Sequence, residues 1–501
     1  MADPASTGAP AAPAAADADR RSRERVEQCL ARSAALGRGR AELGGRTLDY
    51  DVHAAFVPVV AAGLAGAGNE PEAAVFATAY LLRGAAAADR PVCFAFNGGP
   101  GSASIWLQFG ALGPKRVVVA DDGNQPRAPY AVTDNPASWF AHFDLVFIDP
   151  PHTGWSITAG EAVRKKLLSV DGDADALAEV VRAWLTRHRR WGSPVYLAGE
   201  SYGTTRGAVL ADKLQAQGVS LSGLVLVSCA MDLQSLVFAP RNDLPYALFL
   251  PGFANTAQYH GLLKGPIAAS PEAARAAAEA FAADDYVAAL HAGHRLDGRA
   301  RSRIARRIAE LTGLPQPLVE QQNLRISDER FFTEALRPQG RIVGRLESRV
   351  SAPMPAQQGH TMEFDPGIEA LQGPYTMAAL AWYGEVLGLH AAARYEVFAE
   401  DVYRQWNWSR GTEQGNGFAC TSPDLGRALR RNPHLKVFVA SGRYDLGTPY
   451  SASDWSLAQL DVDAGVRARI THRHYDAGHM MYTREPDLRR LEADLAAWLR
   501  A

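Results

Sequence analysis

The segment Gly199-Glu200-Ser201-Tyr202-Gly203 constrains the fold more than any other part of the sequence. It follows a strand-like run, Pro194 to Ala198, and precedes a helix expected from Gly203 to Gln217. A serine flanked by glycines in this context predicts a sharp strand-to-helix turn, because the serine backbone is strained and its neighbours must allow close approach. Such a turn presents the Ser201 hydroxyl at the carboxyl edge of a sheet.

Other apolar runs end in Gly, Pro or acidic residues and indicate further buried strands. These runs are Val92 to Phe96, Asp144 to Asp149, Gly223 to Cys229 and Leu435 to Ala440, and the strand pattern returns at Arg469 to His474. Continuous apolar runs fit strands that are buried on both faces of a mostly parallel sheet. A helix capped by Asp171 and the helix after Ser201 alternate with them, which predicts βαβ units and a doubly wound α/β sheet.

The order of these elements predicts an α/β core with an inserted cap. Residues 43–233 and 411–501 carry the alternation of strands and helices, whereas Ala-rich helical segments dominate residues 234–410. Residues 1–42 are expected to be a disordered Ala/Pro-rich tail. The tail lacks the basic start and apolar centre of a signal peptide, and no apolar run has the length of a membrane-spanning helix. The default prediction is therefore a cytoplasmic protein.

Charge and cysteine content exclude several partners. The 501 residues include 52 Lys and Arg against 54 Asp and Glu, a net charge of −2, so we expect neither nucleic acid nor membrane as the main partner. The Arg-rich stretch 299–307 is expected to be a solvated helix face. The cysteines (Cys29, Cys93, Cys229 and Cys420) are far apart and favour free thiols, although one disulfide stays open. The oligomeric state is open too.

A serine hydroxyl needs a base to act as a nucleophile, and the partners in such folds follow in the order Ser, Asp, His. Asp445 comes directly after one buried strand, and His479 follows another. We expect His479 to take the Ser201 proton and return it to the leaving group, while Asp445 fixes the imidazole tautomer and stabilises its cation.

The loop Asn97-Gly98-Gly99-Pro100-Gly101 follows an earlier strand. A Gly-rich loop there donates one oxyanion-hole amide in this architecture, and the residue after the nucleophile donates the other. These donors would be the N–H groups of Gly99 and Tyr202. The alternatives are a tight turn or a phosphate-binding loop, but G-x-x-x-x-G-K-[ST] is absent.

A metal site is the alternative interpretation of the histidines near the C-terminus. His472, His474 and His479 lie close together in the sequence. However, the spacing offers no acidic or cysteine ligand, and no H-E-x-x-H motif is present. Neither a metal nor a cofactor is therefore predicted.

Several motifs together resemble the serine carboxypeptidases. They are NGGPGSAS at 97–104 with LGP at 112–114, NPASW at 135–139, DP at 149–150 with GWS at 154–156, GESYG at 199–203 and AGHM at 477–480. The resemblance implies an α/β-hydrolase fold with a helical cap. It also implies release of C-terminal residues from peptide substrates through a triad of Ser201, Asp445 and His479.

The resemblance further implies that Asn97 and Glu200 bind the substrate's terminal carboxylate. Two carboxylates repel unless one is protonated, so a protonated Glu200 would donate a hydrogen bond and activity would favour acidic pH. Three positions depart from the family pattern. Ser102 stands where a cysteine is usual, Ala111 where a glutamate is common before L-G-P, and Tyr444-Asp445 replaces the usual G-D-x-D.

Three functions are compatible with these residues. A serine-type carboxypeptidase acting through an acyl-enzyme on Ser201 is the leading prediction. An esterase or acyltransferase on the same scaffold is the alternative, which Ala111 favours slightly. A non-catalytic binding protein is the third, although an intact set of Ser201, Asp445 and His479 argues against it. Trp106, Tyr246 and Met480 are candidates for the pocket lining, and residue preference cannot be read from the sequence.

Overall fold

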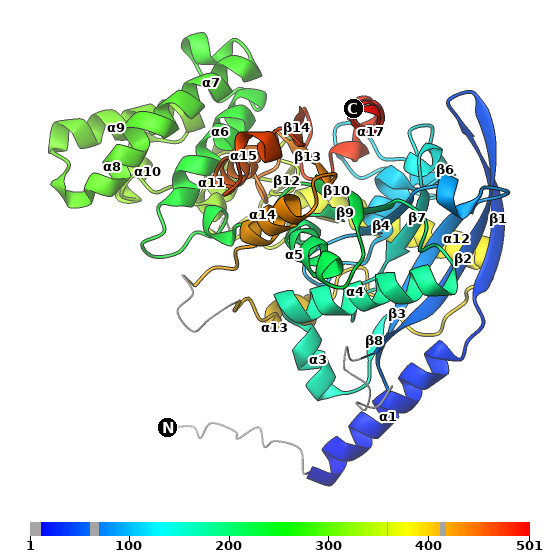
Figure 1. The fold of residues 1–501 in the computed structure, drawn as a ribbon. Helices are drawn as coiled ribbons and strands as arrows, with labels where there is room; N and C mark the ends of the chain where they lie inside the picture. The colour runs from blue at the N-terminus through cyan, green and yellow to red at the C-terminus, as the bar shows by residue number, and fades with distance from the viewer. Residues whose placement is uncertain (1–11, 61–69, 358, 411–416) are drawn as a thin grey trace.

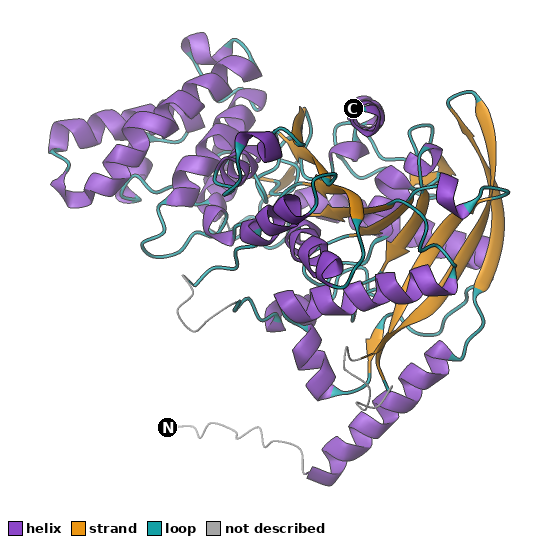
Figure 2. Ribbon diagram, viewed as in Figure 1, coloured by secondary structure: helices purple, strands orange, loops and turns teal. Residues whose placement is uncertain are grey.

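A computed structural model describes residues 12–60, 70–357, 359–410 and 417–501. Its centre is a ten-stranded sheet with the order β1-β2-β3-β7-β4-β9-β10-β13-β14, in which β8 pairs with β3 (Figures 1 and 2). The strands are β1 Ala35–Leu43, β2 Arg46–Val60, β3 Pro71–Leu82, β4 Val92–Phe96, β7 Asp144–Ile148, β8 Ile157–Thr158, β9 Val195–Glu200, β10 Leu221–Val227, β13 Lys436–Gly442 and β14 Ile470–Tyr475. From β7 to β14 the path is parallel, whereas β1, β2, β3 and β7 pair antiparallel.

Helices cover both faces of the sheet. One face packs against α4 (Val170–Arg187), α5 (Tyr202–Ala216) and α14 (Ser422–Arg431). The other packs against α12 (Pro366–Leu387) and α17 (Glu485–Arg500). Successive residues of one strand enter opposite layers, because side chains alternate along a strand. The predicted doubly wound α/β sheet, buried on both faces, is therefore confirmed.

The alternation is visible in single strands. Phe94 packs in the α4 layer while its neighbours Cys93 and Ala95 pack in the α12 layer. Helix α4 begins two residues earlier than predicted, because Ser169, and not Asp171, is its N-cap and accepts a hydrogen bond from the Gly172 amide at 3.2 Å.

A separate bundle of helices forms a lobe at one end of the molecule, shown in green in Figure 1. Its helices are α6 Leu244–Tyr259, α7 Pro271–Phe281, α8 Val287–Ala292, α9 Gly298–Thr312, α10 Gln316–Gln321 and α11 Asp328–Glu334. The lobe has its own apolar core, in which the rings of Phe253 and Phe331 stack at 4.2 Å. Short elements complete the described chain: α2 Ile105–Leu107, α3 Glu161–Leu167, α13 Glu400–Gln405, α15 Tyr450–Ala458, α16 Ala464–Arg467, β5 Lys115–Val117, β6 Val132–Asp134, β11 Arg341–Val343 and β12 Ser351–Pro353.

The N-terminal region differs from the expected disordered tail. Residues 12–42 form helix α1 (Ala12–Leu30) and most of β1, which pairs with β2 along its whole length. Val26 on α1 is buried against Ala74 and Ala159. This apolar contact holds the helix on the core, and the Ala-rich composition of the segment gave no indication of it. Residues 1–11 lie outside the described residues.

The predicted cap also differs from the structure. Residues 234–410 were expected to form one helical insertion, but α12 packs in the core layer of the sheet. The Tyr383 hydroxyl on this helix donates to Gln108 at 2.8 Å, which joins the insertion to the core. None of the helices among the described residues is long and apolar enough to cross a membrane. All four cysteines are free thiols.

Candidate active site

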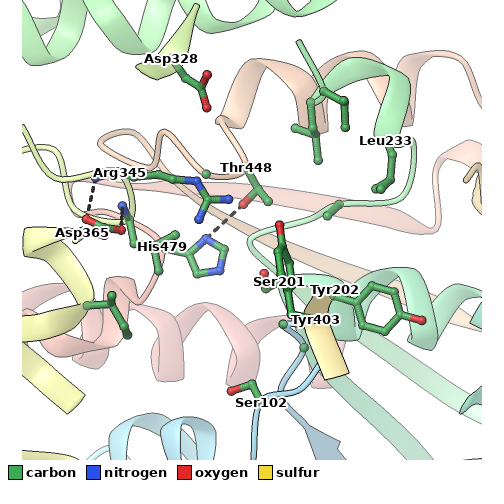
Figure 3. A pocket seen from close by; sticks show the side chains of 18 of the residues that line it. Ser102, Ser201, Tyr202, Leu233, Asp328, Arg345, Asp365, Tyr403, Thr448 and His479 are labelled. Atoms are coloured by element: carbon green, nitrogen blue, oxygen red, sulfur yellow. Dashed lines mark hydrogen bonds between the residues drawn. The ribbon is translucent and has the colours of Figure 1, made fainter. Parts of the chain in front are cut away.

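The loops that follow β4, β9, β13 and β14 meet at one edge of the sheet, because parallel neighbours end together there. They border a cavity of about 1930 Å³ between the core and the helical lobe. Its lining includes Ser201 and His479, which lie on the same side of it in Figure 3. The pocket candidates Trp106, Tyr246 and Met480 line it as well. The cavity exceeds the roughly 300–1,000 Å³ of a site for a small molecule.

The turn that carries Ser201 has the strained geometry that the sequence predicts. Ser201 has φ 59° and ψ −129°, a region that L-residues seldom adopt. A Cβ at Gly199 would lie 2.1 Å from the Gly203 carbonyl oxygen, so the position requires glycine. The Ser201 amide is fixed by the carbonyl of Val227 at 2.9 Å. The strain therefore belongs to a turn that its surroundings hold rigidly.

Asp445 and His479 are in direct contact. The Asp445 carboxylate accepts a hydrogen bond from His479 Nδ1 at 2.7 Å, and both side chains are buried. Although burial opposes the charge on each group, their mutual attraction raises the pKa of His479 and lowers the pKa of Asp445. With Nδ1 engaged, His479 keeps Nε2 available for a proton from a serine.

Thr448 is a further member of this group that the sequence did not reveal. Its hydroxyl donates to Asp445 Oδ2 at 2.6 Å, and its amide donates to Oδ1 at 2.9 Å. The Gly447 amide donates to the same Oδ1 at 2.8 Å. The carboxylate is held on both oxygens, so it can orient the imidazole without rotating. The sequence does carry an indication of these donors, because Gly447 and Thr448 follow Asp445 within three residues.

The loop after β4 lies against the serine turn. A Cβ at Gly98 would lie 2.5 Å from the amide nitrogens of Tyr202 and Gly203, so only glycine allows this approach. The next residue, Gly99, has φ 97°. Tyr202 begins helix α5, so its amide has no acceptor in a preceding helical turn. Within the described chain, neither the Gly99 nor the Tyr202 amide has a hydrogen-bond acceptor.

A buried ion pair supports this loop from behind. Arg206 donates to the Asn97 carbonyl at 2.6 Å and to the Asp173 carboxylate at 2.6 Å. All three residues are buried. A buried ion pair needs such additional bonds to offset its desolvation. Sequence reasoning placed Asp173 only in the first turn of its helix and missed Arg206 altogether, because their pairing depends on how α4 and α5 pack.

Glu200 and Asn97 lie at the floor of the cavity. Burial raises the pKa of Glu200 to about 7, so its carboxyl is largely protonated in mildly acidic solution. The Tyr482 hydroxyl donates to Glu200 at 2.7 Å, and the Asn97 side chain is a further partner. The Asn97 carboxamide oxygen accepts from the Leu107 amide at 3.0 Å, which turns its NH₂ group toward Glu200 and Tyr482. Tyr482 was not predicted as part of the site.

Residues 344–350, between β11 and β12, form a segment that we call the brace. It runs beside the loops that carry the acid and the base. The Leu346 carbonyl accepts from the His479 amide at 2.7 Å, and the Arg345 carbonyl accepts from the Leu446 amide at 2.9 Å. The Glu347 carboxylate accepts from the Gly478 amide at 2.8 Å. The brace belongs to the insertion, where the sequence predicted only a cap.

The brace also places a positive charge in the cavity. The Arg345 side chain lines it near Thr448 and His479 (Figure 3). Among the described residues, its guanidinium forms no ion pair, although Asp328 and Asp365 act on it at longer range. Arg345 counteracts the rise in the pKa of His479. The charge is therefore coupled to the base without touching it.

The three histidines near the C-terminus do not form one cluster, because only His472 and His474 lie side by side. His479 pairs with Asp445, as described above, whereas His472 and His474 both contact Asp454. The sequence spacing gave no sign of Asp454, which lies on α15.

Residues 62–235 match the sequence model of the family described as serine carboxypeptidase. This matched segment, which carries the Asn97–Gly101 loop and Ser201, is similar to that family. The fold is an α/β-hydrolase fold, in which the strained serine turn follows a central strand and Asp and His follow later strands. The similarity of this segment and the fold are both typical of hydrolases.

Solved structures with weaker likeness include three hydrolases. A proline iminopeptidase from Mycobacterium smegmatis is 14% identical, with a TM-score of 0.36, over 89% of this chain and 97% of that chain. A juvenile hormone epoxide hydrolase from the silkworm Bombyx mori is 13% identical, with a TM-score of 0.34, over 90% and 78%. The Cif epoxide hydrolase from Acinetobacter nosocomialis is 13% identical, with a TM-score of 0.31, over 99% and 100%. No curated protein matches the chain.

The departures from the serine carboxypeptidase pattern have structural counterparts. Ser102 lines the cavity and accepts a hydrogen bond from the Trp106 indole at 3.0 Å. Ala111 is fully buried in the layer that packs on the sheet and is not among the described residues that line the cavity. Asn135 and Ser138, from the NPASW motif, bind backbone carbonyls of residues 111–113 and so hold that segment.

Proposed function

We propose that the protein is a serine-type carboxypeptidase that releases C-terminal residues from peptides. The observation that carries the proposal is the buried carboxyl of Glu200, one residue before Ser201, whose pKa of about 7 keeps it protonated in mildly acidic solution. A protonated carboxyl in a site of this kind can donate a hydrogen bond to a carboxylate, which an ionised one repels. The substrate group that uses such a donor is the terminal carboxylate of a peptide.

The proposed reaction begins with attack of Ser201 Oγ on the last peptide carbonyl. His479 Nε2 takes the serine proton, and the amides of Gly99 and Tyr202 donate to the oxyanion of the tetrahedral intermediate. His479 then gives the proton to the leaving amine, which departs as the released amino acid and leaves an acyl group on Ser201. Attack by water, with His479 again as base, frees the shortened peptide and restores the serine.

The carboxylate subsite would be made by Asn97 and Glu200. The Asn97 carboxamide oxygen accepts from the Leu107 amide, which orients the NH₂ group, and the Tyr482 hydroxyl donates to Glu200. Binding the terminal carboxylate there fixes the scissile carbonyl beside Ser201, because the two sites are one residue apart. The width of the cavity leaves room for several residues of peptide on the acyl side.

An esterase or acyltransferase is the second candidate. The observation that favours it is Ala111, which is buried and does not line the cavity. Serine carboxypeptidases commonly have a glutamate at this position, which contributes to the carboxylate subsite. A subsite with fewer donors discriminates less well against substrates that lack the carboxylate.

The experiment compares N-blocked dipeptides with the same peptides carrying a C-terminal amide, from pH 4 to 8. Release of the last residue from the free acid and not from the amide is the expected result. Ser201→Ala is the control and should abolish release, with unchanged circular dichroism. Hydrolysis of simple esters without cleavage of either peptide would replace the proposal by the esterase reading.

A further inference from the structure

Three side chains that the proposed reaction does not use converge on one point at the end of the sheet. His472 and His474 lie two residues apart on β14, so they project from the same face of the strand. Asp454, on α15, meets both of them. Its Oδ1 lies 3.0 Å from His472 Nδ1 and 3.2 Å from His474 Nε2. One ligand atom from each of the three residues lies within 4.8 Å of the other two.

We propose that Asp454, His472 and His474 form a binding site for a divalent transition-metal ion of the Zn²⁺ class. Zn²⁺ takes imidazole nitrogen and carboxylate oxygen at about 2.0–2.2 Å, so the ligands of a tetrahedral ion lie roughly 3.3 Å apart. The nitrogen–oxygen distances of 3.0 and 3.2 Å are close to that edge length. An ion needs only small side-chain shifts to enter, and water completes its coordination on the open side.

The surroundings of His472 suit a metal ligand. The ring uses Nδ1 toward Asp454 and Nε2 toward the Ser441 hydroxyl at 2.9 Å, so both nitrogens are oriented. A ligating histidine is normally fixed in this way through its second nitrogen.

The carboxylate supplies the negative charge. One oxygen that faces two imidazoles requires a proton or a cation between each pair of atoms. A divalent ion can bind all three groups at once, whereas without an ion each imidazole must turn an N–H toward the shared oxygen.

The position of this site links it to the loops of the proposed triad. Strand β14 leads to His479, and α15 follows the Asp445 turn. An ion held by all three side chains would join β14 to α15. We therefore expect the ion to stabilise the protein and to leave the chemistry itself unchanged. The proposed ion site does not depend on the protein being a carboxypeptidase.

The test uses the full chain, stripped of metal with a chelator and titrated with Zn²⁺ in a calorimeter and with Co²⁺ in a spectrophotometer. The variants are Asp454→Asn, which removes the charge at a half-exposed position, and His474→Ala. His291→Ala is the control, because this exposed histidine lies outside the cluster. Circular dichroism and the metal-free melting temperature establish that each variant is folded.

We expect one ion per chain for the wild type and the control. For either cluster variant we expect affinity at least about tenfold weaker. Zn²⁺ should raise the melting temperature of the wild type and not that of the variants. Equal isotherms for wild type and both variants would place the ion elsewhere and overturn the proposal. Absence of Zn²⁺ and Co²⁺ binding to the folded wild type would overturn it as well.

Discussion

The amide of His479 donates a hydrogen bond of 2.7 Å to the carbonyl of Leu346. This bond joins the loop of the proposed base to the brace, while the neighbouring Arg345 carbonyl accepts from Leu446 in the loop of the proposed acid. Two consecutive carbonyls thus hold both loops. A Cβ at Gly478 would lie 2.3 Å from the Leu346 oxygen, so this contact requires glycine. The brace sets the relative position of acid and base.

Replacing Glu347 by alanine should loosen this arrangement. The buried carboxylate accepts from the Gly478 amide and pairs with Arg349 at 2.7 Å. Its loss therefore leaves the Arg349 guanidinium and the Gly478 amide without this partner. We expect the free energy of unfolding, measured with urea, to fall by about 3 kcal/mol, and kcat to fall with it. Glu310→Ala, in an exposed pair with Arg307, is the control and should cost under about 1 kcal/mol. Equal effects of the two substitutions would contradict a bracing role.

Glu200→Gln should change the pH dependence of peptide cleavage. In the wild type, kcat/KM for a free-acid peptide should fall as pH rises through about 7, because Glu200 ionises and repels the substrate carboxylate. The glutamine stays neutral, so this decline should disappear. An ester substrate without a carboxylate serves as the control and should show no such decline in either protein. A variant that loses activity at the same pH as the wild type would show that another group titrates.

The same substitution makes a prediction about stability. The folded-state pKa of Glu200 is raised from 4.5 to about 7, so the native state holds the proton more tightly than the unfolded chain. That contribution is lost as pH rises through about 7. Glu200→Gln should therefore exceed the wild type in free energy of unfolding at pH 8, by up to roughly 3 kcal/mol, and match it near pH 4. Urea titrations at the two pH values measure the difference.

Arg345→Met should move the acidic limb of the pH profile. The guanidinium counteracts the rise in the pKa of His479, so its removal should raise that pKa further. Since only the neutral imidazole can accept the serine proton, activity should be lost at a higher pH than in the wild type. Arg345→Lys keeps the charge and should restore the original limb. The rates of ester hydrolysis from pH 4 to 8 give the comparison, and an unmoved limb in the methionine variant would refute the coupling.

Gly98→Ala should damage the oxyanion-binding loop. The added Cβ would lie 2.5 Å from two backbone nitrogens of the serine turn, which cannot move aside as a flexible side chain could. We expect kcat to fall about 10²-fold or more through displacement of the Gly99 amide. Gly192→Ala is the matched control, because a Cβ there meets no atom within 4 Å. A Gly98→Ala enzyme with wild-type kcat would remove this loop from the proposed reaction.

The regular part of the fold could be predicted from the sequence because its signals are local. The apolar run Val92 to Phe96 coincides with β4, and the run from Asp144 ends one residue beyond β7. Helix α1 and strand β1 were missed because Ala- and Arg-rich stretches of low apolar content carry little local signal. Contacts with other parts of the chain stabilise these two elements, such as the pairing of β1 with β2.

The site residues likewise include some with a local sequence signal and some without one. Asp445 and His479 were found because each follows a strand-like run, and the structure brings the two together. Arg206, Tyr482 and the brace were missed, since each contributes through a contact with a residue distant in the sequence. Asp454 illustrates the same limit, because strand spacing shows two histidines on one face but not the helix that covers them.

The location of the brace also decides how this architecture can be divided into exchangeable modules. The helical lobe, residues 244–334, has its own core, whereas the brace and α12 follow it in the same insertion and contact the His479 loop and the sheet. A chimera that exchanges the lobe alone keeps every contact to His479 and Leu446. A chimera that exchanges residues 234–410 also removes the Leu346 and Arg345 carbonyls. A chimera meant to change substrate preference should therefore end its exchanged segment before β11.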